Sequence, residues 1–110
     1  MALELKTLTP TTVTIPKVGD VLLKKMSSTD LASLYDWHSA LSEQERSSNL
    51  MWLHYQARMV IGCACNEDGS PQFSEEQVGV VANQEWLPEV YDQCVSLSKL
   101  TKEDEEAKKD

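Results

Sequence analysis

Apolar residues recur at helical spacing through the middle of the chain. Between residues 43 and 65 they are separated by three, four, three and four positions, at Leu50, Leu53, Ala57, Val60 and Ala64. This spacing places these residues on one side of an α-helix, in a continuous row that we call the apolar seam. The seam is wider than a helix on a domain surface needs, because it is flanked by Met51, Trp52, Tyr55, Met59 and Ile61. The pattern predicts a helix from about Glu43 to Cys65 that lies at the centre of the fold or in a partner interface.

The residues before this helix predict a hairpin and a first helix. Polar and β-branched apolar residues alternate over residues 12–15, turn-forming residues occupy 16–20, and a second extended run follows over 21–26. Ser27 stands three residues before Asp30 and predicts a helix N-terminus. The apolar side of that helix is formed by Leu31, Leu34, Tyr35, His38 and Leu41. Ser42 with Glu45 repeats the capping pattern, which indicates either a second start or a kink before the longer helix.

The residues after the long helix predict a turn and two more helices. Residues 66–71 read Asn-Glu-Asp-Gly-Ser-Pro, a dense turn signal. Ser74 with Gln77 predicts a short helix that ends near Glu85. A further helix begins at Leu87-Pro88, and its apolar side is formed by Leu87, Val90, Cys94 and Leu97.

Together these elements predict a mainly α-helical α+β fold, an N-terminal β-hairpin followed by three to four helices. We expect residues 1–11 to form a flexible arm, residues 12–100 to form a single helical domain, and residues 101–110 to form a charged flexible tail. A length of 110 residues suits one domain.

The net charge of the chain indicates which classes of binding partner are disfavoured. Ten Lys and Arg oppose 18 Asp and Glu, which gives a formal net charge of -8. Such a surface repels phosphate backbones and anionic lipids, so we expect neither nucleic acid nor membrane as a partner. We expect no signal peptide in residues 1–10 and no membrane span, and therefore a cytoplasmic protein.

Candidate catalytic and metal-binding residues are few. Cys63, Cys65, Cys94 and His54 lack the paired spacing of a structural zinc site, and we expect free thiols. Residues 66–75 partly match a calcium-binding loop, but Ala64 stands where its first carboxylate belongs. The acids at helix starts and the histidines His38 and His54 form no catalytic set. The sequence predicts neither an enzyme nor a cofactor.

Aromatic residues are the candidates for partner binding. Trp37, Trp52 and Trp86 could be core residues or contact anchors, and we expect Trp52 in the core. Trp86 lies at a helix junction and is the stronger candidate for an exposed anchor. We expect Trp86 and Tyr91 to contribute to a partner surface together with Trp37, and Phe73 to shape it.

Three sequence segments, in this order, resemble those of a known protein family: LLKKMSSTDLASLY, ARMVIGCACNEDGSPQFSEEQV and LPEVYDQCVSLSKLTKEDEEAKKD. The chain resembles the tail assembly chaperones of long-tailed bacteriophages. In that family a helix ending in Arg and small apolar residues precedes an acidic Gly-Pro-Phe turn, and a later helix ends in a Leu-Thr phrase and a charged tail. Residues 58–78 and 97–104 carry the match, and the order of features covers about residues 12–110.

The resemblance implies a non-virion protein of the host bacterial cytoplasm that binds the tape measure protein and helps recruit tail tube subunits. It implies no catalytic residues. Family members are often made in two lengths by ribosomal frameshifting, which implies a longer form of the chain, and association into a homo-oligomer is also consistent with this role. The alternative is a small phage or bacterial structural or regulatory protein-binding factor, acting in tail completion or host inhibition. A redox or metal-binding protein is the third hypothesis.

Overall fold

The computed structural model describes the backbone of residues 9–108 and the side chains of residues 9–97. It begins with the predicted hairpin, whose strands β1 (Thr11–Ile15) and β2 (Gly19–Leu23) pair antiparallel with Val13 opposite Val21. The turn places Lys17 and Gly19 at positive φ, 71° and 106°, and glycine accepts that conformation without strain. Ile15 and Leu23 are almost fully buried and anchor the hairpin to the helices. The predicted arm is described only from residue 9, and residues 1–8 lie outside the described part.

Helix α1 (Ser28–Ser39) begins where the sequence predicts. The Ser27 hydroxyl oxygen accepts a hydrogen bond from the Asp30 backbone N–H at 3.1 Å. This bond satisfies one of the N–H groups that a helix start leaves unpaired. The predicted capping box follows in α2 (Glu43–Arg46), where Ser42 and Glu45 exchange side-chain to backbone hydrogen bonds of 3.0 and 3.2 Å.

The sequence predicts one long helix from about Glu43, and this prediction is wrong in one respect. Helix α2 ends at Arg46, and a separate helix, α3 (Asn49–Cys63), follows it. The Ser47 hydroxyl donates to the Glu43 carbonyl at 3.0 Å, and the Ser48 hydroxyl accepts from the Met51 N–H at 3.4 Å. Serine side chains compete with the backbone for its hydrogen-bonding groups. Two serines in a row therefore end α2 and cap α3.

The end of α3 is tied to the hairpin. Residue 64 leaves the helix in an extended conformation and forms a bridge with Leu23. The Lys24 N–H donates to the Cys63 carbonyl at 2.8 Å, and the Cys65 N–H donates to the Leu22 carbonyl at 3.1 Å. The chain then turns at the predicted place, with Gly69 at φ 84°.

The C-terminal part contains a 3₁₀ turn, η1 (Glu75–Gln77), followed by α4 (Val78–Ala82) and α5 (Leu87–Lys108). Helix α4 ends at Ala82, before the predicted end near Glu85. Helix α5 continues through residues 101–108 of the segment that we expect as a charged tail, and residues 109–110 lie outside the described part. Among the helices described, none has the length and apolar composition needed to cross a bilayer.

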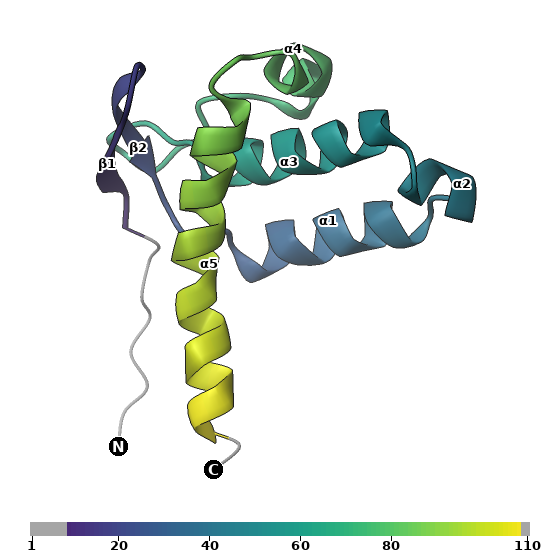
Figure 1. Ribbon diagram of the computed structural model, residues 1–110. Coiled ribbons are helices and arrows are strands. Elements are labelled where there is room, and N and C mark those ends of the chain that lie inside the picture. The colour runs from purple at the N-terminus through teal and green to yellow at the C-terminus, as the bar shows by residue number, and fades with distance from the viewer. Residues whose placement is uncertain (1–8, 109–110) are drawn as a thin grey trace.

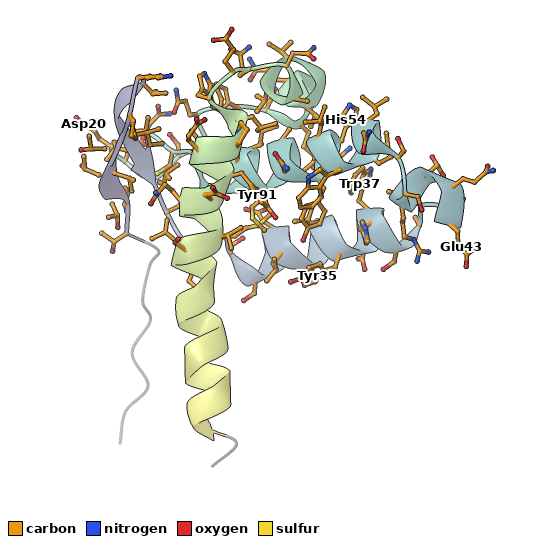
Figure 2. All side chains as sticks on the ribbon, in the orientation of Figure 1. Asp20, Tyr35, Trp37, Glu43, His54 and Tyr91 are labelled. Carbon is orange, nitrogen blue, oxygen red and sulfur yellow. The ribbon has the colours of Figure 1, made fainter. Side chains whose placement is uncertain are left out.

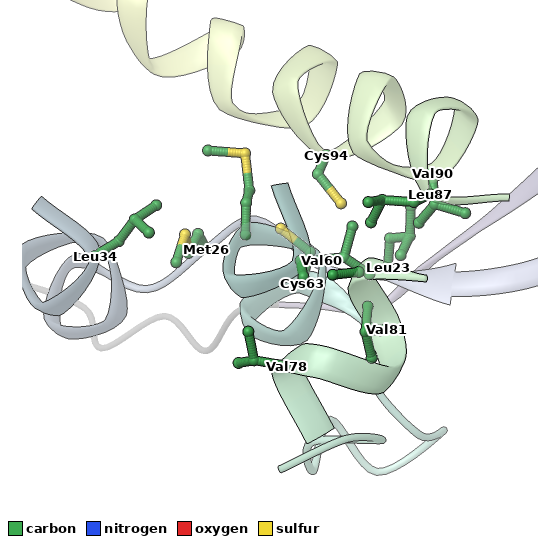
Figure 3. Packing of buried hydrophobic residues seen from close by; sticks show 14 of the residues in the cluster. Leu23, Met26, Leu34, Val60, Cys63, Val78, Val81, Leu87, Val90 and Cys94 are labelled. Atoms are coloured by element: carbon green, nitrogen blue, oxygen red, sulfur yellow. The ribbon is translucent and has the colours of Figure 1, made fainter. Parts of the chain in front are cut away.

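Helix α3 is the centre of the molecule (Figure 1). Helix α1 runs beside it, α4 and α5 pack against it, and the hairpin lies at the start of α5. The core joins all of these elements, as Figure 3 shows for Leu23, Val60, Val81 and Leu87. The prediction of a mainly helical α+β fold with an N-terminal hairpin is confirmed.

Candidate functional site

The apolar seam of α3 is buried in the core only along the C-terminal half of the helix. Its buried residues all lie from Gln56 onward, and Ala57 and Val60 expose no surface. Leu53 is 37% exposed and Leu50 is 56% exposed. The prediction of Trp52 in the core is therefore wrong, since Trp52 is 50% exposed, and the helix lies at the centre of the fold only over its C-terminal half. The physical reason is that the neighbouring elements cover only the C-terminal half of α3.

An open groove of about 450 Å³ lies beside this exposed half of α3. We call it the aromatic groove, and its lining residues are Tyr35, His38, Arg46, Met51, Trp52, Tyr55 and Tyr91. They come from α1, α2, α3 and α5, so residues far apart in the sequence form one surface. Figure 2 labels two of these residues, Tyr35 on α1 and Tyr91 on α5.

The rings of the groove pack against one another. Trp52 stacks on Tyr55 with centroids 5.6 Å apart, and it meets Tyr91 in a T-shaped contact at 5.7 Å. His38 contacts Tyr55 at 5.6 Å, also T-shaped. These distances lie in the range of favourable aromatic pairs. The rings therefore hold one another in place while Trp52 keeps half of its surface open to solvent.

The three tyrosines of the groove influence one another electrostatically. The pKa of Tyr55 is raised by burial first and then by the neighbouring Tyr35. The pKa of Tyr91 is raised by burial first and then by Tyr55 and Asp92. The phenols of Tyr55 and Tyr91 stay uncharged at neutral pH, because an unperturbed tyrosine already titrates near 10 and both pKa values are raised. The groove thus presents aromatic rings and phenolic oxygens beside the Arg46 guanidinium.

Arg46 lines the groove, whereas Arg58 on α3 lines a separate hollow, and both side chains have contacts within the chain. The Arg46 guanidinium donates to the Leu41 carbonyl at 3.0 and 3.1 Å and to the Ser39 carbonyl at 3.4 Å. Arg58 lies over the face of Trp37, 4.5 Å from the ring centroid. Arg46 thereby compensates the carbonyl groups at the end of α1, and Arg58 is held by a cation–π contact.

The four residues predicted for partner binding fall in two places. Tyr91 lines the aromatic groove, and Trp37 lies next to it, 6.5 Å from His38. Phe73 and Trp86 instead stack on each other at 6.3 Å beside the hairpin. There they help to line a smaller hollow of about 240 Å³. Trp86 is half-buried against the core rather than projecting into solvent.

Sequence reasoning assigned Trp52 to the core and did not single out Tyr35, His38 or Tyr55 for partner binding. Tyr35 with His38 and Trp52 with Tyr55 are each three positions apart, a spacing that places two rings on one side of a helix. That spacing was a usable signal. The set of helices that meet at the groove depends on the break between α2 and α3.

The cysteines and the turn serve structural contacts. Cys94 on α5 points toward Cys63 on α3 in Figure 3, and the pKa of its thiol is raised by their hydrogen bond and then by burial. All three thiols are free and buried. In the turn, the Asp68 carboxylate accepts from the Ser70 N–H at 2.9 Å and from its hydroxyl at 2.6 Å. Within the described residues, no three His, Cys, Asp or Glu side chains are grouped for metal binding.

Comparison with known proteins identifies a relative in fold. No protein-family model matches the chain, and no curated protein sequence is significantly similar to it. Its structure is similar to that of the bacteriophage HK97 tail assembly chaperone, with a TM-score of 0.62 and 20% sequence identity. The similarity covers 82% of this chain and 85% of that one. The resemblance seen in the sequence is therefore confirmed at the level of the fold.

Proposed function

We propose that this protein is a tail assembly chaperone of a long-tailed bacteriophage, which binds the tape measure protein and helps to recruit tail tube subunits. The observation that carries the proposal is the likeness of nearly the whole fold to the HK97 tail assembly chaperone. The sequence phrases at residues 58–78 and 97–104 point to the same family independently of that likeness.

The surface of α3 supports a binding role. Leu50, Trp52 and Leu53 are consecutive or near neighbours on one helix, and each exposes more than a third of its surface. Tyr35 on α1 is 53% exposed. Exposed apolar residues that gather in one region of a small protein mark a site of contact with another protein. A chaperone needs such a surface before its partner arrives.

The charge of the chain suits the same role. A net charge of -8 keeps a protein with exposed aromatic residues in solution through mutual repulsion. The proposed setting is the cytoplasm of the infected bacterium, without nucleic acid or membrane as partners. A frameshifted longer form and a homo-oligomer remain part of the proposal.

Co-expression tests the proposed function. The gene for the partner is expected next to this one and encodes a very long helical protein. Co-expression with the parent chain should raise the soluble fraction of that protein, and Trp52→Ser should remove the gain. Val80→Ser is the matched control, because Val80 is 63% exposed on α4 and does not line the aromatic groove. No gain with the parent chain would favour the structural or regulatory binding factor instead.

A further inference from the structure

We propose that the aromatic groove binds an apolar segment of the partner protein that carries a glutamate or aspartate, and that this carboxylate pairs with the guanidinium of Arg46. The inference rests on the proposed function and deepens it, because it names the chemistry that the partner brings to the groove. Arg46 sets the preference for an acidic side chain, while Trp52 and the tyrosine rings cover the apolar residues beside it.

The first support is the charge of the lining. Arg46 is the only permanently charged side chain among the residues that form the groove, and none of them is an aspartate or a glutamate. An anion that enters the groove therefore meets a cation and no carboxylate. The net charge of -8 opposes an anion from greater distances. At an ionic strength of about 0.15 M, however, exposed charges more than about 8 Å away are largely screened, so the contact with Arg46 decides which sign of charge the groove accepts.

The second support is the hydrogen-bonding character of the lining. Arginine and the tryptophan indole only donate hydrogen bonds, and a tyrosine hydroxyl can donate as well as accept. The groove contains one arginine, one tryptophan and three tyrosines, but no carboxylate and no side-chain amide. A carboxylate only accepts hydrogen bonds and an ammonium group only donates them. The lining therefore suits a carboxylate better than an ammonium group.

The third support is that Arg46 is held in place with N–H groups still open to a partner. Its Nε donates to the Leu41 carbonyl, and its Nη2 donates to the carbonyls of Leu41 and Ser39. These bonds account for the N–H groups of Nε and Nη2. Among the residues that the structure describes, Nη1 has no hydrogen-bond partner, and the side chain as a whole is exposed. Because the end of α1 already fixes the guanidinium, little side-chain freedom is lost when a carboxylate binds it.

The fourth support is the position of Arg46 relative to the rings. It comes from α2, which joins α1 and α3 at the end away from α5 (Figure 1), whereas Tyr91 comes from α5. Trp52 contacts Tyr91 at 5.7 Å and keeps half of its own surface open to solvent. A segment that lies along the groove from α5 toward α2 therefore packs apolar side chains on the rings and brings a carboxylate to Arg46.

Three synthetic peptides test the inference. Each is an amphipathic helix of about four turns with blocked ends and leucine along one side. One position in the middle of that side is glutamate, glutamine or lysine, and glutamine has the size of glutamate without its charge.

Each peptide is titrated into the isotope-labelled full chain at an ionic strength of about 0.15 M. The indole N–H signal of Trp52 is followed, assigned from its loss in Trp52→Phe. We expect the glutamate peptide to shift this signal and to bind about two- to fivefold more tightly than the glutamine peptide, which is the range for an exposed ion pair. The lysine peptide should bind most weakly.

Charge reversal at Arg46 then separates the ion pair from a general effect of charge. Arg46→Glu should reverse the order of the peptides, and Arg46→Gln should bind the glutamate and glutamine peptides equally. Lys25→Glu is the matched control, because it changes the net charge as much as Arg46→Glu does, is exposed and does not line the groove. It should keep the order that the parent shows. Thermal melts show which variants are folded, and if an Arg46 variant is not, the order of the peptides on the parent still decides.

Each of three results would overturn the inference. The first is a glutamate peptide that binds the parent no more tightly than the glutamine or the lysine peptide does. The second is an unchanged preference for glutamate in folded Arg46→Gln. The third is a Trp52 signal that moves when the chain alone is diluted, because a second copy of the chain would then occupy the groove.

Failure of the proposed function gives a different result. The tape measure protein would then not bind, although the groove discriminates the peptides as expected. If instead the tape measure protein binds the parent while the peptides are not discriminated, the inference about Arg46 fails and the proposed function stands.

Discussion

Substituting Ala57 by Asp should unfold the domain, whereas the same change at Leu53 should not. Both residues belong to the seam of α3, four positions apart. Ala57 exposes none of its surface and lies in the half of α3 that the neighbouring elements cover. An aspartate there would lose its water without gaining a partner. The penalty for such a buried ion is several kcal/mol, of the same order as the ~5–15 kcal/mol that stabilises a whole domain.

Leu53 is 37% exposed, so an aspartate at that position can turn its carboxylate toward water. The loss is then the partial burial of the leucine, a fraction of the ~1.5–3 kcal/mol that complete burial contributes. We therefore expect Leu53→Asp to cost about 1 to 2 kcal/mol and Ala57→Asp to cost at least ~3 kcal/mol.

Urea unfolding followed by circular dichroism measures both values. Ala57→Ser, which adds a small polar group without charge, serves as the control at the buried position. The reasoning would be refuted by Ala57→Asp and Leu53→Asp with equal midpoints, because the seam would then be equally exposed at both places.

Three further predictions follow from other parts of the molecule. Ser48→Ala should lower the free energy of unfolding by about 1 kcal/mol, since it removes the cap of α3, and an unchanged urea midpoint would contradict that role. A maleimide should label Cys63 and Cys94 of the folded chain far more slowly than those of the unfolded chain, because both are fully buried and the pKa of the Cys94 thiol is raised; rapid labelling under native conditions would count against the α3–α5 packing. The gene should carry a slippery run of adenines at the codons of Lys108 and Lys109, followed by an overlapping frame, and mixed lysine codons without such a run would remove the frameshifted form.

Much of the fold could be predicted because its signals are local. Ser27, Ser42 and Ser74 mark helix or turn starts by their own hydrogen bonds or by the residue three positions later. The hairpin is visible in the alternation of residues 12–15, and the chain reversal after α3 is visible in Asp68 and Gly69. Each of these features depends on a few neighbouring residues.

The exposure of α3 could not be predicted in the same way. Periodicity shows that Leu50, Leu53 and Ala57 share one side of a helix, but it does not show how far that side is covered. Coverage depends on the length of α4, five residues, and on where α5 crosses α3. The aromatic groove exists because this coverage stops short, and among its lining residues only Tyr91 was predicted from the sequence to bind a partner.

The central claim, that this protein binds a tape measure protein through the exposed half of α3, is tested most directly by co-purification. The tagged full chain is purified from cells that also express the long helical protein of the neighbouring gene, alongside Trp52→Ser and Val80→Ser. We predict that the long protein is recovered with the parent and with Val80→Ser and is largely lost with Trp52→Ser. Absence of the long protein from the parent sample, or equal recovery with all three chains, would contradict the claim.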